Sequence, residues 1–173
     1  MKLAPNKISV LAAFSILAVA LFTLENFLPR PLPFLKIGLA NVFVLLILWQ
    51  LDLLSALIVS LVKVFIGSFI SGLVFTPVIL FSLTGSVLSL VIMYIALKIK
   101  IKFSIIGVSI LGALVHNVSQ LCLAYLILFP NTKLFYFLPL LLATGLGAGI
   151  ITGAVAYYLD SKINLHKILQ VNA

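Results

Sequence analysis

The residues best able to do chemistry in this chain are polar side chains placed inside long apolar runs. Lys63 lies near the middle of the apolar run 53–75. Ionisable groups at bilayer depth are costly, so they usually face a cavity or pair with a partner. Lys63 is also too deep for its ammonium to reach either membrane surface easily. We therefore predict that Lys63 contacts a ligand or gates access to one, or alternatively that it forms a structural ion pair.

Glu25 is the only acidic residue within a predicted membrane-spanning run, and Asn26 follows it in the last turn of the first run. A carboxylate at that depth can reach water at the outer face or bond Lys63 across a helical bundle. Glu25 is therefore predicted either to tune a binding site or to serve as the structural partner of Lys63.

A polar patch interrupts the fifth apolar run, where His116, Asn117 and Gln120 lie within one helical turn. His116 and Gln120 are four residues apart, so they share one face of a helix. Side chains of this kind inside a membrane need hydrogen-bonding partners. The patch indicates a binding site, with a polar clasp between neighbouring helices as the alternative.

The second apolar run opens on the segment Lys36-Ile-Gly-Leu-Ala-Asn41, which combines a basic residue, a glycine and an amide. The free N–H groups at the start of a helix could help this segment hold a carboxylate or phosphate. The alternative is an interfacial anchor. The predicted ligand is small and anionic or amphiphilic, and the predicted substrate-binding residues are Lys63, His116, Asn117, Gln120, Asn41, Lys36, Glu25 and Ser68.

The composition places these residues in a membrane. Of the 173 residues, 64% are hydrophobic and 8% are charged, and the mean hydropathy is +1.38. A soluble domain of this size needs far more polar surface. Backbone groups inside lipid need internal partners, and the apolar runs lack the alternation of membrane strands, so an all-α integral membrane protein is predicted.

Six apolar runs predict a six-helix bundle that forms one transmembrane domain over residues 1–173. The runs cover residues 8–28, 35–51, 53–75, 78–97, 105–129 and 138–159. The second run is short for a crossing of about 20 residues, so it is tilted, extended by its flanks or partly re-entrant. We favour a full crossing, because the distribution of basic residues supports it.

Six crossings with a cytoplasmic N terminus put seven lysines inside and three basic residues outside. Lysine and arginine accumulate on the cytoplasmic side of membrane proteins, so this count predicts a multi-pass protein of the cytoplasmic (inner) membrane with both termini in the cytoplasm. The net charge of +8 is therefore read as a topology signal, and a nucleic-acid partner is not predicted.

Several classes of activity lack their motifs in this sequence. There is no phosphate-binding glycine loop, so the chain cannot hydrolyse ATP alone, and active transport would need a partner or an ion gradient. The sequence also has no metal-ligand cluster, no aspartate-rich pair for magnesium and diphosphate, and no catalytic triad. We predict no cofactor, no metal and no enzymatic activity in this chain.

The combined pattern resembles a known family. It consists of Lys36-Ile-Gly-Leu-Ala-Asn41, Lys63, Gly67-Ser68, Ser71-Gly72, Pro77, Ser82-Leu-Thr-Gly85, Ser89, His116-Asn117 and Gln120. This pattern is similar to the membrane family called heptaprenyl diphosphate synthase component I, or the Gx transporter family. The family is similar in size and helical plan to the substrate-binding S components of energy-coupling factor (ECF) transporters, which capture micronutrients.

The resemblance implies how such a protein would work. S components dock on a membrane coupling subunit through small residues of the first helix, typically alanines four apart, and this chain offers Ser9 and Ala13 instead. ATPase subunits would then supply energy, and the bundle would topple to release its substrate inward.

Three functions follow as hypotheses. The first is an ECF S-component-like, substrate-binding transport subunit. The second is a non-catalytic membrane subunit that assists a soluble prenyl synthase in isoprenoid or quinone metabolism, as the family label implies. The third is a purely structural bundle, in which the polar residues pair only with each other.

Overall fold

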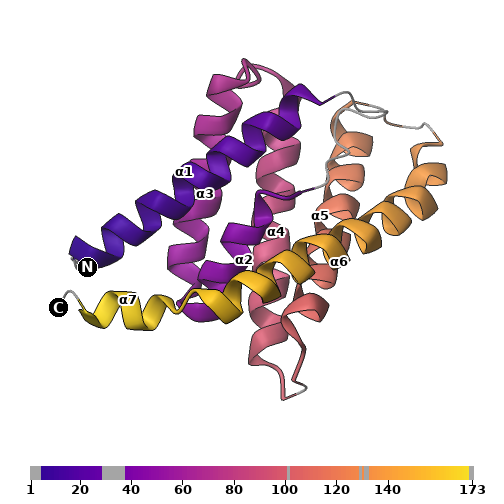
Figure 1. Cartoon of the computed structure of the whole chain (residues 1–173). Helices are drawn as coiled ribbons and strands as arrows, with labels where there is room; N and C mark the ends of the chain where they lie inside the picture. The colour runs from indigo at the N-terminus through magenta and orange to yellow at the C-terminus, as the bar shows by residue number, and fades with distance from the viewer. Residues whose placement is uncertain (1–4, 29–37, 101, 129, 131–132, 172–173) are drawn as a thin grey trace.

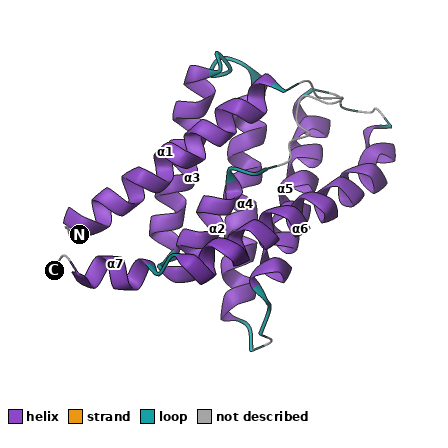
Figure 2. Ribbon diagram, viewed as in Figure 1, coloured by secondary structure: helices purple, strands orange, loops and turns teal. Residues whose placement is uncertain are grey.

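The computed structural model describes residues 5–28, 38–100, 102–128, 130 and 133–171. This part of the chain is helical and contains no strand (Figures 1 and 2). Among the described residues, five helices are long and apolar enough to cross a membrane. They are α1 (Pro5–Phe27), α3 (Leu53–Ile70), α4 (Pro77–Lys98), α5 (Ile105–Ile127) and α6 (Leu138–Lys162). Three shorter helices complete the described fold, namely α2 (Asn41–Gln50), η1 (Leu134–Phe137) and α7 (Leu165–Val171).

Local sequence signals set several helix ends. Asp52 caps the start of α3 by accepting a hydrogen bond from the Ser55 N–H (2.8 Å), and Ser104 caps α5 in the same way. Pro77 opens α4, where a missing N–H does no harm. Helix α3 ends before Gly72, whose φ of +68° suits glycine, so it stops short of the end of the predicted run 53–75.

Helix α2 is too short to cross a bilayer by itself. Its ten residues span about 15 Å, half of a hydrocarbon core of about 30 Å. It follows a turn at Gly38, which has a φ of +79° and accepts a hydrogen bond from the Asn41 N–H (2.9 Å). Figure 1 shows α2 starting part-way along the bundle. The predicted run 35–51 begins outside the described residues, so a sixth crossing stays a prediction.

At one end of the bundle, the start of α1 lies near α7 and the α2–α3 turn (Figure 1). Lys7 in α1 forms an ion pair with Asp52 at 2.7 Å. Gln50 donates from its amide to Asp160 in α6 (2.6 Å) and accepts from the Leu165 N–H at the start of α7 (2.8 Å). These bonds fasten α1, α3, α6 and α7 around the C-terminal end of α2.

The helices α4, α5 and α6 pack closely because small residues line their contacts. Helix α5 makes its most extensive contacts with α6 and then with α4. Gly149 and Gly153 of α6 lie directly against the backbone of α5 at Ile110 and Ile106. Small residues let membrane helices approach in this way, where lipid offers no hydrophobic driving force.

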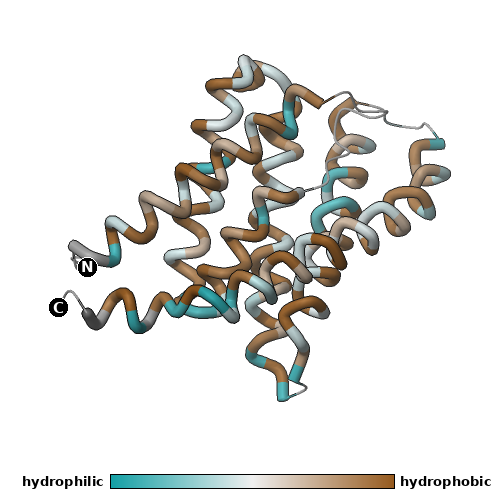
Figure 3. Tube along the Cα trace, in the orientation of Figure 1, coloured by the Kyte–Doolittle hydropathy of each residue, from teal (hydrophilic) through white to brown (hydrophobic). Residues whose placement is uncertain are grey.

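The outer surface of the bundle is apolar. Large hydrophobic side chains such as Phe65, Phe69, Ile150 and Ile151 are exposed. Figure 3 shows hydrophobic residues along most of the helices, with hydrophilic residues at the α4–α5 loop, near the α6–α7 junction and in a stretch part-way along α5. A soluble monomer rarely exposes apolar area on this scale. The predicted all-helical, multi-pass membrane architecture is confirmed by the five apolar helices.

The Lys7–Asp52 pair predicts a pH-dependent stability. Partial burial favours the protonated carboxyl, but hydrogen bonds from Lys7 and Ser55 outweigh it and hold the pKa of Asp52 below its ordinary value of 3.8. A carboxyl whose pKa is lowered by folding stabilises the fold fully above its unfolded-state pKa. This contribution is lost as the pH falls from the unfolded-state pKa through the folded-state pKa. Asp52→Asn should therefore flatten the acid side of the stability profile.

Thermal unfolding in detergent at about pH 6 and about pH 3 measures this effect. Asp52→Asn keeps a side-chain oxygen for the helix cap, whereas Asp52→Ala also removes the cap and should cost about 1 kcal/mol more. Equal acid destabilisation of the wild type and Asp52→Asn would contradict the assignment of the pH dependence to this carboxyl.

Candidate functional site

Lys63 is buried inside the bundle, with 2% of its surface exposed. Its ammonium donates a hydrogen bond to the Asn41 side-chain oxygen at 2.5 Å and lies 6.0 Å from the centre of the Phe22 ring. Phe22 packs with Val64 and Ala40 in a small apolar cluster beside it. Gly67 makes room for this ring, because a Cβ at that position would collide with it. Lys63 therefore links α3 to the first residue of α2, and the Phe22 ring of α1 lies beside its ammonium.

Glu25 completes this polar centre from the end of α1. Its buried carboxylate accepts a hydrogen bond from the Leu39 N–H at 2.5 Å and attracts the Lys63 ammonium electrostatically. The two opposite charges thus hold the Gly38–Asn41 turn from both sides, Glu25 through the backbone and Lys63 through Asn41. Three of the predicted residues, Lys63, Asn41 and Glu25, therefore lie around the same turn, and their role in binding stays a prediction.

A small cavity of about 30 Å³ lies next to this centre, between α2, α4, α5 and α6. Asn41 lines it and so connects it with Lys63. Its other polar walls are Ser89, Ser109 and Thr152, and the Ser109 and Thr152 hydroxyls are 2.8 Å apart. Gly38 borders the cavity from the turn. This polar space can hold a water molecule or one polar group of a ligand.

The patch of α5 makes contacts with its neighbouring helices. Asn117 donates to the Leu141 carbonyl of α6 (2.9 Å), and Gln120 donates to the Phe81 carbonyl of α4 (3.2 Å). His116 packs against Gly85, where a Cβ would lie 2.8 Å from its ring. The hydrogen bonds of Asn117 and Gln120 join α5 to its neighbours, as expected for the alternative of a polar clasp between helices. A binding role for the three side chains stays a prediction.

The remaining predicted residues lie apart from this centre or outside the described chain. Lys36 lies outside the described residues. Ser68 is buried in α3, and its backbone carbonyl accepts a hydrogen bond from the Leu73 N–H (2.8 Å) at the helix end. Ser9 and Ala13 are both exposed on α1, on a surface open to lipid or to another subunit.

Sequence reasoning missed Ser109 and Thr152 as members of the site. A signal for them exists in the spacing of small residues at intervals of three or four. In α5 this spacing gives the buried residues Ser109 and Gly112, and in α6 it gives Gly145, Gly149, Thr152 and Gly153. Such series mark helix faces that approach closely, and the hydroxyls among them point to a polar interior.

The site lacks the groups of a metal centre. Across the described part of the chain, no three His, Cys, Asp or Glu side chains come together in a way that could hold a metal ion. The polar groups that line the cavity are the Asn41 amide and the hydroxyls of Ser89, Ser109 and Thr152, and the Lys63 ammonium lies behind Asn41. Together these donors suit an oxygen-bearing, anionic ligand group.

The fold and this site define a class, a multi-pass helical membrane protein with two opposite charges and a small cavity in its interior. A family model described as heptaprenyl diphosphate synthase component I matches residues 14–159. The chain therefore belongs to this family, as its sequence pattern predicts. No curated protein matches the chain, and no solved structure matches it.

Proposed function

We propose that this protein is a membrane-embedded, substrate-binding component of a transporter, similar to ECF S components, that takes up a small anionic or amphiphilic micronutrient or precursor. The observation that carries the proposal is the start of α2. This helix begins inside the bundle, at the contact between Asn41 and Lys63 and beside the polar cavity. A structural bundle has little need for a helix start and a lysine at that depth.

The electrostatics of the centre favour an anionic group. The N-terminus of a helix carries a partial positive charge, and broken helices in transporters direct such ends at anionic substrate groups. Lys63 adds a full positive charge. Glu25 acts as an internal carboxylate that satisfies Lys63 and the Leu39 N–H in the closed form. A ligand carboxylate or phosphate would compete with Glu25 for the same two groups.

Binding must enlarge the cavity, because about 30 Å³ holds only a water-sized group. The Gly38–Asn41 turn is the element best placed to move, since it borders the cavity and is held by two side-chain bonds. In this scheme His116, Asn117, Gln120 and Ser68 line the enlarged pocket. Lys36 lies outside the described residues, and its predicted contribution is a positive charge for the same ligand. Ser9 and Ala13 would dock on a coupling subunit that carries the ATPases.

A second candidate function rests on the family to which the chain belongs. The family's name implies a partner synthase component. In this candidate the chain is a membrane subunit that assists polyprenyl diphosphate synthesis without catalysing it. It would anchor a soluble synthase or present lipid substrate to it.

Native mass spectrometry of the full chain purified from membranes tests the proposal. The wild type is expected to retain a small anionic molecule. The double variant Lys63→Met/Glu25→Gln should lose it, with occupancy falling about tenfold or more, because a charge-assisted hydrogen bond contributes about 1.5–3 kcal/mol. Lys133→Met removes an exposed lysine from the connection between α5 and α6, and this variant should retain the bound molecule.

The same purification distinguishes the two functions. Recovery with a coupling subunit and ATPases supports transport, whereas recovery with a prenyl synthase and no bound small molecule supports the helper subunit. Undiminished retention of the molecule by the double variant would refute the Lys63 site.

A further inference from the structure

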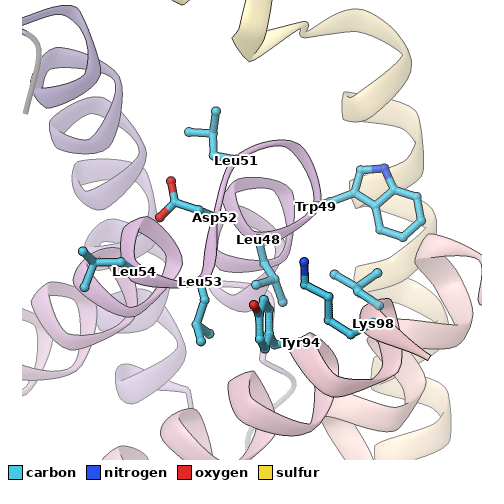
Figure 4. Close-up of a pocket in the computed structure, with 9 residues that line it drawn as sticks. Leu48, Trp49, Leu51, Asp52, Leu53, Leu54, Tyr94 and Lys98 are labelled. Atoms are coloured by element: carbon cyan, nitrogen blue, oxygen red, sulfur yellow. The ribbon is translucent and has the colours of Figure 1, made fainter.

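A second pocket, separate from the Lys63 centre, opens at the end of the bundle where α1 begins and α7 lies. Its volume is about 540 Å³, within the range of small-molecule sites. The end of α2, the α2–α3 turn and the end of α4 line it (Figure 4). The residues that decide its chemistry are Leu48, Trp49, Asp52, Tyr94, Leu97 and Lys98.

The positive charge of this pocket is available to a ligand. Lys98 is exposed, with its ammonium 5.4 Å from the centre of the Tyr94 ring. Asp52 also lines the pocket, but its carboxylate pairs with Lys7 at 2.7 Å. Figure 4 shows the amine of Lys98 and the hydroxyl of Tyr94 directed toward Leu48, while the Asp52 carboxylate lies on the opposite side.

The rest of the pocket suits a hydrocarbon chain at the membrane surface. Leucines of α2, of the α2–α3 turn and of α4 form its apolar walls. Trp49 and Tyr94 are of the two residue types that membrane proteins place at headgroup depth, where an apolar ring and a polar edge are both satisfied. Lysines 100 and 102 follow in the adjoining loop and add positive charge near the same end.

We propose that this pocket binds the phosphate headgroup of an anionic lipid. Lys98 contacts the phosphate, the Tyr94 hydroxyl donates a hydrogen bond to it, and Trp49 and the leucines contact the first part of the lipid chain. The site is independent of the proposed substrate site, since no residue is shared. A soluble phosphate shares the chemistry of the headgroup, but the apolar walls favour the lipid.

Trp49 supplies the probe, because it is the only tryptophan in the chain and it lines the pocket. The full chain is reconstituted in phosphatidylcholine vesicles that contain a small fraction of brominated lipid, and the quenching of Trp49 fluorescence is measured. Brominated phosphatidylglycerol should quench about fivefold more effectively per molecule than brominated phosphatidylcholine, the effect of about one lysine near an anionic headgroup. Equal quenching by the two lipids would overturn the proposal.

Two lysine variants separate the pocket from the general positive charge of this end. Lys98→Gln should abolish the preference for phosphatidylglycerol. Lys162→Gln is the matched control, because Lys162 also lies in the last turn of its helix and over a tyrosine ring, that of Tyr158 at 5.9 Å, but does not line the pocket. The control should keep the preference. Loss of the preference in both variants, or in neither, would overturn the site.

Inorganic phosphate distinguishes the source of the anion. Added to vesicles of pure phosphatidylcholine, it should leave the Trp49 emission unchanged, and it should not relieve quenching by brominated phosphatidylglycerol. A saturable change in emission with inorganic phosphate would assign the pocket to a soluble anion and overturn the lipid proposal. Lys98 is exposed at a helix end, so both glutamine variants should fold, which circular dichroism in the same vesicles verifies.

Discussion

Lys63→Met is expected to destabilise the bundle by about 3–5 kcal/mol, the usual cost of breaking a buried pair of charges. The variant leaves the buried Glu25 carboxylate without the ammonium that attracts it. It also removes the donor to Asn41, so the start of α2 loses one of its two side-chain attachments. The measurement is the unfolding free energy from reversible denaturation in mixed micelles.

A double-mutant cycle identifies the cause. Adding Glu25→Gln to Lys63→Met removes the stranded charge while keeping an acceptor for the Leu39 N–H, so most of the lost stability should return. Lys133→Met controls for the loss of an exposed lysine and should stay near the wild type. If the two substitutions simply add, Glu25 and Lys63 are not coupled, and the polar centre described above is held together by other contacts.

Gly149→Ala should destabilise the protein by about 1–3 kcal/mol, the cost of forcing extra volume into a packed interior. A Cβ at this position would lie 2.6 Å from the Cα of Ile110, and a backbone atom cannot move aside as a side chain can. Helix α6 would therefore shift away from α5. As a result, the hydrogen bond between the Ser109 and Thr152 hydroxyls in the cavity wall would lengthen.

The control for this prediction lies in the same helix. A Cβ added at Gly147 meets no other atom within 4 Å, so Gly147→Ala should change stability by less than about 1 kcal/mol, and in the direction of a better helix former. Thermal unfolding of both variants in one detergent makes the comparison. Equal melting temperatures for the two variants would show that α5 and α6 can separate at no cost at Gly149.

Much of the helical framework is readable from the sequence, because local chemistry decides it. The apolar runs predict the helices that could cross a membrane, and Asp52, Ser104 and Pro77 mark helix starts by their own caps and ring geometry. The end of α3 is less readable. It depends on the positive φ at Gly72, which the apolar residues after it conceal.

The candidate site is less predictable, because its parts come from distant segments. Lys63 and Glu25 are evident as charges out of place in apolar runs, and their attraction was one of the predicted alternatives. Ser109 and Thr152 are marked in the sequence only by their place among regularly spaced small residues, which does not show that they face each other. Only the close approach of α5 and α6 at the glycines turns them into walls of one cavity.

The amino-acid sequence by itself determined that this is a helical membrane protein and that a lysine and a glutamate lie within its apolar, membrane-spanning segments. Hydrophobicity and charge are properties of single residues and short windows, so they need no fold to be read. Only the tertiary structure decided that α2 starts part-way along the bundle, where Asn41 meets Lys63 and the turn before it meets Glu25. Those contacts join segments far apart along the chain, and helix packing alone brings them within bonding distance.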